Sequence, residues 1–171
     1  MLLGLDPGQS DCGVSVLRNK RLVEATWLQA PHRLENGPRG WRAMAEIVKN
    51  WATVQELREE RITAVAFERM HPRGDDDPAK LLTIMGLLAV SVWVCALFPQ
   101  AEHVGFFPTQ WRGSAKGRGT YCAHVQERLD PHEKTRLILP AKRFQHNVYA
   151  AIGIALKAVG RFEFERVYSS T

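Results

Sequence analysis

The hydrophobic positions of this 171-residue chain fall first into short runs and then into a helical spacing. Apolar runs at residues 2–6, 13–17 and 21–28 are separated by turn-forming residues, which is typical of a three-stranded antiparallel meander. From residue 39 to 60 the apolar side chains recur every three or four positions, which predicts an amphipathic helix. The next run, residues 62–67, is almost wholly apolar and predicts a parallel strand covered by helices on both faces.

The second half of the chain continues this alternation of strands and helices. Residues 103–107 predict a fifth strand that ends at Pro108, and residues 146–159 predict a last helix. The segment 108–118 between them has three basic residues, no acids and two glycines, so we expect an irregular segment there. The chain is short for two domains, and we expect a single α/β domain over residues 1–171, with helices flanking a five-stranded mixed sheet.

One segment, residues 81–98, has 18 residues without a charge and reaches the lower limit of membrane-spanning length. It is a lone segment, it contains Thr83, Gly86 and Ser91, and it lies between the predicted strands of one sheet. We therefore predict a central helix that is buried on most sides, and no membrane span.

Composition and charge indicate a globular protein with a phosphate-rich partner. The chain is 45% hydrophobic and 24% charged, its formal net charge is +5 and its pI is about 9.4, which favours nucleic acid among the partners. Cys12, Cys95 and Cys122 are far apart and form no CxxC motif, so neither a disulfide framework nor a zinc site is predicted. We expect a cytoplasmic protein without a secretory leader.

Two carboxylates mark the ends of predicted strands. Asp6 ends the first apolar run and precedes Pro7-Gly8, and Glu68 ends the run that starts near residue 64. Ligands and metal ions collect at strand ends in α/β sheets, so the two acids predict one shared site for a polyanion. The structural alternatives are a turn acid at Asp6 and, for Glu68, an ion pair with Arg69 or Arg73.

These residues belong to a longer pattern that resembles the RuvC-like branch of the ribonuclease H superfamily. The matching pieces are LGLDPG at 3–8 with Gly13 after it, AVAFE at 64–68, PTQWRG at 108–113 followed by Lys116, and HNVYAAIGIAL at 146–156. Actin-like phosphotransferases open with a similar LGLDPG, but they need a second domain for which 171 residues leave no room.

The resemblance implies a ribonuclease H-like fold and a crossover junction endodeoxyribonuclease that resolves Holliday junctions and other branched DNA. In such enzymes paired Mg²⁺ ions, for which Mn²⁺ can substitute, activate a water and stabilise the leaving 3′ oxygen. By this resemblance Asp6, Glu68 and Asn147 are the expected metal ligands, and Lys116 is a further catalytic residue. His146 is a candidate proton carrier.

The chain departs from the family pattern in the last helix. The family has an acid at the position held by Ala150, and an acid or histidine at the position held by Asn147. Positions 147 and 150 share one helix face, which we expect to point at the metals, while Val148 and Ile152 pack on the core. We therefore predict that hydrolysis is impaired, through an Asp-to-Ala substitution made to trap substrate or in a naturally deficient member; the alternatives are a non-catalytic junction-binding protein and an ordinary helix alanine.

DNA contacts are predicted for two basic segments and for the loop after Glu68, because lysine and arginine bind phosphates without reading sequence. Met70 is a candidate apolar wedge between unstacked bases. The predicted DNA-binding residues are Arg69, Met70, Arg73, Arg112, Lys116, Arg118, Lys142 and Arg143. A simple surface is the alternative for each.

A two-fold homodimer is also predicted, because a four-way junction needs matched cuts in two strands and each chain has one site. The helix at residues 81–98 has more apolar surface than one sheet face can cover, and the resemblance places the dimer contact there, with Trp93 as an anchor. The alternative is complete burial of this helix within one protomer.

Overall fold

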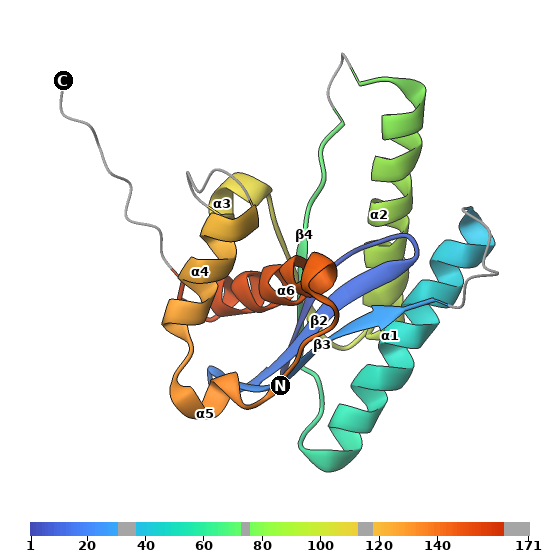
Figure 1. Cartoon of the computed structure of the whole chain (residues 1–171). Coiled ribbons are helices and arrows are strands. Elements are labelled where there is room, and N and C mark those ends of the chain that lie inside the picture. The colour runs from blue at the N-terminus through green and yellow to red at the C-terminus, as the bar shows by residue number, and fades with distance from the viewer. Residues whose placement is uncertain (31–36, 73–75, 113–117, 163–171) are drawn as a thin grey trace.

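A six-stranded mixed sheet forms the centre of the computed structural model, which describes residues 1–30, 37–72, 76–112 and 118–162 (Figure 1). The strand order is β5-β4-β1-β2-β3-β6. β1, β2 and β3 form the predicted antiparallel meander, while β4 pairs with β1, β5 with β4 and β6 with β3 in parallel. The strands are β1 Leu2–Asp6, β2 Asp11–Arg18, β3 Arg21–Gln29, β4 Ala64–Glu68, β5 Glu102–Phe106 and β6 Leu137–Ile138.

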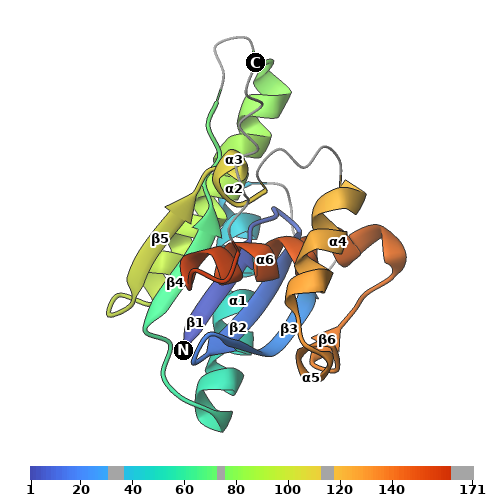
Figure 2. The same cartoon turned by 90° about the vertical axis from the view of Figure 1, so that its left-hand side faces the viewer.

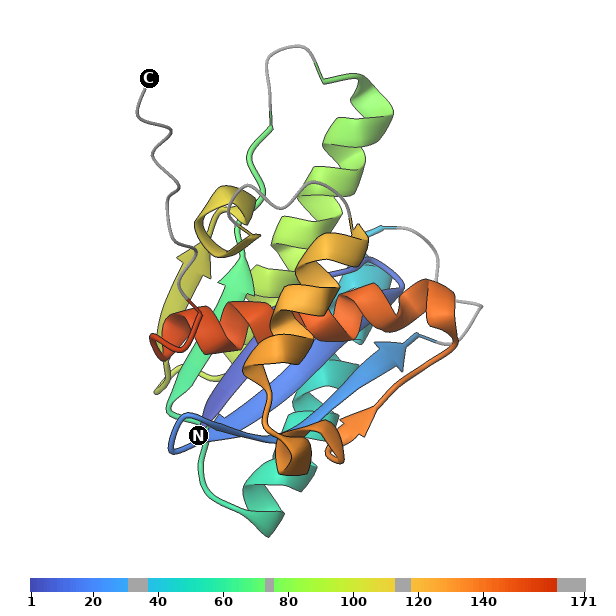
Figure 3. The same ribbon diagram turned by 60° about the vertical axis from the view of Figure 1, so that its left-hand side comes forward.

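Helices cover both faces of the sheet. α6 crosses one face, with α3 and α4 packed on its outer side, and α1 lies on the opposite face together with α2 (Figures 2 and 3). The helices are α1 Pro38–Arg58, α2 Pro78–Leu97, α3 Pro108–Arg112, α4 Arg118–Arg128, α5 Pro131–Lys134 and α6 Gln145–Ala158, with a 3-10 turn η1 at Lys142–Phe144.

The predicted fold class is confirmed, and three details differ from the prediction. The sheet has a sixth strand, β6, whose two residues are too few to produce an apolar pattern. The segment predicted to be irregular contains the short helix α3, while residues 113–117 lie outside the described part of the chain. α4 and α5 were not predicted; α5 begins with a capping box, in which Asp130 and Glu133 bond each other's backbone N–H groups.

Close packing against the sheet explains two of the glycines at its centre. A Cβ at Gly4 would lie 2.5 Å from the Ala151 carbonyl oxygen, and one at Gly13 would lie 1.9 Å from the Asn147 carbonyl oxygen. Ser15 of β2 donates a hydrogen bond to the Ala151 carbonyl at 3.0 Å. α6 therefore rests directly on β1 and β2, and its middle residues, 148–156, are all buried.

α2 is less buried than predicted. Only five of its residues are buried, and its exposed apolar side chains include Leu82, Met85, Val92 and Trp93. The prediction that this helix is buried on most sides of one protomer is wrong, because on its inner side it packs mainly on α1. Complete burial within one protomer is excluded for the same reason.

Within the described residues, α2 is also the one helix long and apolar enough to cross a membrane, with 22% of its most apolar 18-residue window buried. Length and composition alone are weak support for a span, because an exposed apolar helix is equally suited to a protein interface. The absence of a membrane span stays a prediction.

A buried carboxylate ties the last part of the described chain to the meander. Glu133 is 1% exposed and accepts hydrogen bonds from the backbone N–H of Leu22 at 2.7 Å and from both terminal nitrogens of Arg161 at 2.6 and 2.9 Å. Burial alone would raise the pKa of Glu133, but these bonds and the one from Asp130 N–H lower it to about 2. This cluster stabilises the sheet end away from the candidate site.

Candidate active site

Asp6 and Glu68 end two neighbouring parallel strands. β1 and β4 pair with Leu5 opposite Phe67, so the next residues along both strands, Asp6 and Glu68, are level with each other. Gly4 faces α6 and Ala66 belongs to the core cluster under α6, so alternation puts Asp6 and Glu68 on that same face. The sheet thus brings two acids, 62 positions apart in the chain, to one edge beneath the start of α6.

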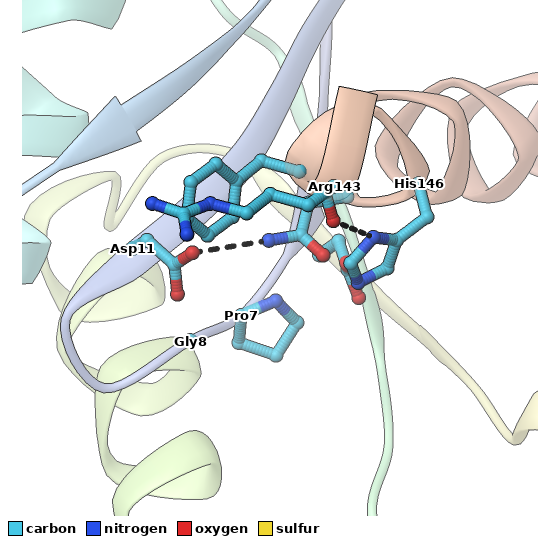
Figure 4. Close-up of a pocket in the computed structure, with 8 residues that line it drawn as sticks. Pro7, Gly8, Asp11, Arg143 and His146 are labelled. Atoms are coloured by element: carbon cyan, nitrogen blue, oxygen red, sulfur yellow. Dashed lines mark hydrogen bonds between the residues drawn. The ribbon is translucent and has the colours of Figure 1, made fainter. Parts of the chain in front are cut away.

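A hollow of about 350 Å³ opens beside Asp6, where the β1–β2 turn meets the start of α6. Figure 4 shows Asp11 on one side of it, His146 on the other and Pro7 beneath. Asn147 donates a hydrogen bond to Asp11 Oδ2 at 3.3 Å, and the Trp27 indole donates to the same oxygen at 3.0 Å. The hollow therefore holds a second carboxylate, Asp11, with its position fixed by two donors.

Glu68 lies in a different environment from Asp6. Its side chain is 1% exposed, and its Oε2 accepts hydrogen bonds from the Trp111 indole at 2.8 Å and from Arg112 Nη2 at 2.7 Å. The ion pair that the structure gives Glu68 is thus with Arg112 and not with Arg69, whereas Arg73 lies outside the described residues. Burial raises the pKa of Glu68 and outweighs the lowering effect of Arg112 and Trp111.

Aromatic rings surround the Arg112 guanidinium. Its Cζ lies 4.7 Å from the centre of the Trp111 ring and 5.2 Å from that of Tyr121, and the two rings meet edge to face at 5.5 Å. Trp111 is completely buried, and a Cβ at Gly153 would lie 2.9 Å from its ring. α3 therefore inserts an indole and a guanidinium between α6 and the end of β4.

The predicted residues of α6 lie in two different environments. Asn147 and His146 line the hollow with Asp6, as their position at the start of the helix allows. Ala150 is completely buried in the core cluster that contains Trp111 and Val148. The expected stripe of Val148 and Ile152 packs on the core, but the face carrying Ala150 is buried as well, so its side chain ends among core residues.

No protein-family model matches this chain, and no curated protein matches it in sequence. It is similar to Thermus thermophilus RuvC in complex with a Holliday junction substrate, with a TM-score of 0.58 and 16% identity over 92% of this chain and 91% of that one. It is also similar to a further Thermus thermophilus RuvC structure, with a TM-score of 0.54 and 16% identity over 95% of this chain and 98% of that one. For the yeast mitochondrial Holliday junction resolvase Ydc2 the TM-score is 0.51 and the identity is 11%, over 91% of this chain and 76% of that one.

The chain has the RuvC fold. The match covers almost the whole length of both chains, so the predicted ribonuclease H-like architecture is confirmed. A fold supports many activities, and at 11–16% identity the likeness says nothing by itself about activity. The roles of Asp6, Glu68, Asn147, Ala150 and the predicted cofactor stay predictions.

The donor set beside the RuvC-like strand ends does not fit a two-ion centre. Among the residues that the structure describes, no group of three or more His, Cys, Asp or Glu side chains could hold a metal ion. Two divalent ions would bring four positive charges, whereas Asp6, Asp11 and Glu68 supply three negative ones and Arg112 already neutralises Glu68. Mg²⁺ binds mainly through carboxylates and water, and Ala150 provides neither a charge nor an oxygen at its position.

Some of the predicted DNA-binding residues lie just before α6 and others directly after β4. Lys142 and Arg143 are exposed just before α6, and Arg143 lines the hollow with Asp6. Arg69 is exposed and its guanidinium lies 5.1 Å from the Phe107 ring, while Met70 is half-buried.

The other predicted residues are less informative. Arg112 contacts Glu68, and Arg118 begins α4. Arg73 and Lys116 lie outside the described residues.

Two residues of the site were missed by the sequence reasoning. Asp11 begins β2 five residues after Asp6, and an acid at a strand start next to a turn gave a signal that could have been used. Trp111 was quoted only as part of a motif, and its contact with Glu68 joins positions 43 apart, which no local pattern indicates.

Proposed function

We propose that this chain recognises four-way DNA junctions in the manner of RuvC-type resolvases, and that Ala150 leaves its phosphodiester hydrolysis impaired. The observation that carries the proposal is the RuvC fold over 92% of the chain together with Asp6 and Glu68 at adjacent strand ends. One of the similar solved structures is Thermus thermophilus RuvC in complex with a Holliday junction substrate, which supports branched DNA as the partner. The net charge of +5 favours the same class of partner.

The residues around the hollow have distinct tasks in this proposal. Lys142 and Arg143 attract the phosphates of a strand that passes the start of α6. Arg69 and Met70 face an opened junction centre from the end of β4, where an apolar side chain can separate bases. Asp6 marks the position of the scissile phosphate, and His146, whose Nδ1 lies 2.9 Å from the Arg143 carbonyl oxygen, is the proposed proton carrier there.

The proposed working form is a two-fold dimer that contacts its copy through α2. Leu82, Met85, Val92 and Trp93 are 52, 59, 66 and 41% exposed, and they lie along one stripe of the helix. Such a stripe is costly to leave in water, and a second copy of α2 would cover it. Mg²⁺ remains the proposed cofactor of an active form, although this chain lacks a full set of ligands for it.

The experiment that tests the proposal compares this chain with Ala150→Asp on a four-way junction and on a linear duplex of the same sequence. With Mg²⁺, we expect symmetric nicks in the junction from the Asp variant and little or none from the unsubstituted chain. Ala150→Asn is the matched control, because it fills the same volume without the charge. If Asp and Asn variants are equally inactive, the proposed defect at position 150 is wrong.

A junction-binding protein without any catalytic step is the second candidate. The ion pair between Glu68 and Arg112 favours it, because an acid that is already paired is poorly placed to bind an ion. Cleavage by Ala150→Asp separates the two candidates, since a scaffold that has lost further requirements would bind the junction and still not cut it.

A further inference from the structure

Glu68, the acid that would hold a metal ion in a RuvC-like site, is already neutralised from within the chain. We infer that the Arg112 guanidinium is a built-in counter-ion that takes the place of a divalent cation at Glu68, so that this chain binds no metal ion through Glu68. The inference rests on the proposed function only because a RuvC-like site is where such an ion would be expected. It concerns Arg112, for which the sequence predicted only a DNA contact.

The contact between Arg112 and Glu68 has the geometry of a fixed pair. Nη2 lies 2.7 Å from Oε2, and Glu68 is 1% exposed, so water does not compete for that oxygen. The Arg112 side chain is 32% exposed, half the exposed fraction of Arg42 and Arg58 on α1, which are each 64% exposed. The two side chains are therefore in direct contact at the end of β4.

Neighbouring rings hold the guanidinium in this place. Its Cζ lies within 5.2 Å of the ring centres of Trp111 and Tyr121, at distances where a cation is attracted to an aromatic ring. Tyr121 is itself 3% exposed. Moving Arg112 away from Glu68 would therefore also break two cation–ring contacts.

Trp111 occupies a second part of the space around Glu68. Its indole N–H donates to the same Oε2 at 2.8 Å, so that oxygen has two donors. The ring is completely buried and lies so close to Gly153 that a Cβ there would be 2.9 Å away. The indole cannot withdraw without a repacking of α6, and an ion cannot reach Oε2 while it stays.

The absent acid at position 150 fits the same arrangement. A metal ion at Glu68 would need further carboxylates, and Ala150, buried in the same core cluster as Trp111, offers none. One guanidinium balances one carboxylate, so the site is neutral at Glu68 without any ion. An added Asp at position 150 would upset this balance and favour a cation again.

One atom of Glu68 remains open to an ion. Oε1 is buried and has no hydrogen-bond partner among the residues that the structure describes. Any metal ion held by Glu68 in this chain would have to bind there, so the test must ask whether the Glu68 carboxylate contributes to metal affinity at all.

Mn²⁺ binding without DNA, followed by electron paramagnetic resonance, provides that test. Four proteins are compared: the unsubstituted chain, Glu68→Gln, Arg112→Gln and the double variant. We expect Glu68→Gln to leave the Mn²⁺ dissociation constant within about twofold, whereas Arg112→Gln tightens it by about tenfold and the double variant loses that gain.

Two results would overturn the inference. One is a weakening of about tenfold or more on Glu68→Gln alone, which would make Glu68 a metal ligand with Arg112 present. The other is a folded Arg112→Gln that gains no Mn²⁺ affinity. If Arg112→Gln does not fold, the comparison of the unsubstituted chain with Glu68→Gln still decides, because it leaves Arg112 in place.

Junction binding is measured separately, so that failure of the proposed function is distinguishable from failure of this inference. We expect Arg112→Gln to leave the salt dependence of junction affinity unchanged, because the guanidinium serves Glu68. If Arg112→Gln instead reduced the slope of log affinity against log salt concentration by about one, Arg112 would be assigned to a DNA phosphate, which would count against the built-in counter-ion.

Discussion

Replacing Ala150 by Asp tests whether position 150 belongs to a metal site. Ala150 is 0% exposed in the cluster that contains Trp111, so the variant places a carboxylate in a site without water. An unpaired buried charge costs about 3–5 kcal/mol. For a chain of this size each kcal/mol shifts the melting temperature by about 2–4 °C, so without metal we expect melting to fall by roughly 6–20 °C.

Mg²⁺ should restore much of the lost stability if the new carboxylate completes a site with Asp6 and Glu68. A ligand at about one hundred times its dissociation constant stabilises the folded state by about 2.7 kcal/mol, or roughly 5–11 °C here. The assay is thermal unfolding of the unsubstituted chain and of Ala150→Asp, in EDTA and in Mg²⁺. The unsubstituted chain should show little difference between the two conditions.

The control is Ala52→Asp, which puts the same carboxylate into a site on α1 that is equally buried but lies on the other face of the sheet. It should lose stability and gain nothing from Mg²⁺. If Ala150→Asp behaves in the same way, position 150 is an ordinary core alanine and the assignment of a missing metal ligand there is refuted.

Three further outcomes follow from the structure. Because the pKa of Glu133 lies at about 2, below its ordinary value near 4.5, its stabilising effect is complete above pH 4.5 and is lost as the pH falls toward 2; Glu133→Gln should cost about 3 kcal/mol at pH 7, a difference that disappears near pH 2 in acid-unfolding curves. Met85→Lys and Val92→Lys should shift a dimer to monomers in sedimentation, because both side chains lie on the exposed stripe of α2. Replacing Lys142 and Arg143 together by Ala should weaken junction binding and reduce its salt slope by about two.

Matched controls exist for each of these variants. Glu127→Gln removes an exposed carboxylate of α4 and should not change acid stability by a comparable amount. Val54→Lys changes an exposed apolar residue of α1 outside the stripe and should leave sedimentation unchanged. Arg39→Ala removes an exposed charge from α1, and a slope change as large as that of the double variant would contradict the assigned DNA surface.

Patterns that repeat along the chain were sufficient for most of the sheet. Alternating and continuous apolar runs predicted five of the six strands, and the parallel pairing of β1 with β4 brings Asp6 level with Glu68 as expected. β6 could not be predicted because it has two residues and depends on pairing with β3. α4 was missed because Tyr121 and Val125 are its only buried residues among 119–128, the part of the helix whose side chains the structure describes.

The surroundings of the acids depend on contacts that sequence patterns do not record. The partner of Glu68 is 44 positions away on a helix of five residues, and the sequence offered nearer arginines instead. Whether other elements of the same protomer cover an apolar helix likewise depends on tertiary packing. The exposure of α2 was therefore underestimated from the sequence. Ala150 was correctly predicted to lie on the last helix. Its complete burial was not predicted, because it involves packing in one cluster with Trp111, which is distant in the sequence.

Recognition of four-way DNA by this chain is tested by a pair of dissociation constants. They are measured by gel shift in EDTA at one salt concentration, for a synthetic four-way junction and for a linear duplex of the same sequence. We predict that the junction binds at least about tenfold more tightly, a difference of about 1.4 kcal/mol. Equal affinities for the two DNAs would contradict the proposal and leave a basic protein with the RuvC fold and another role.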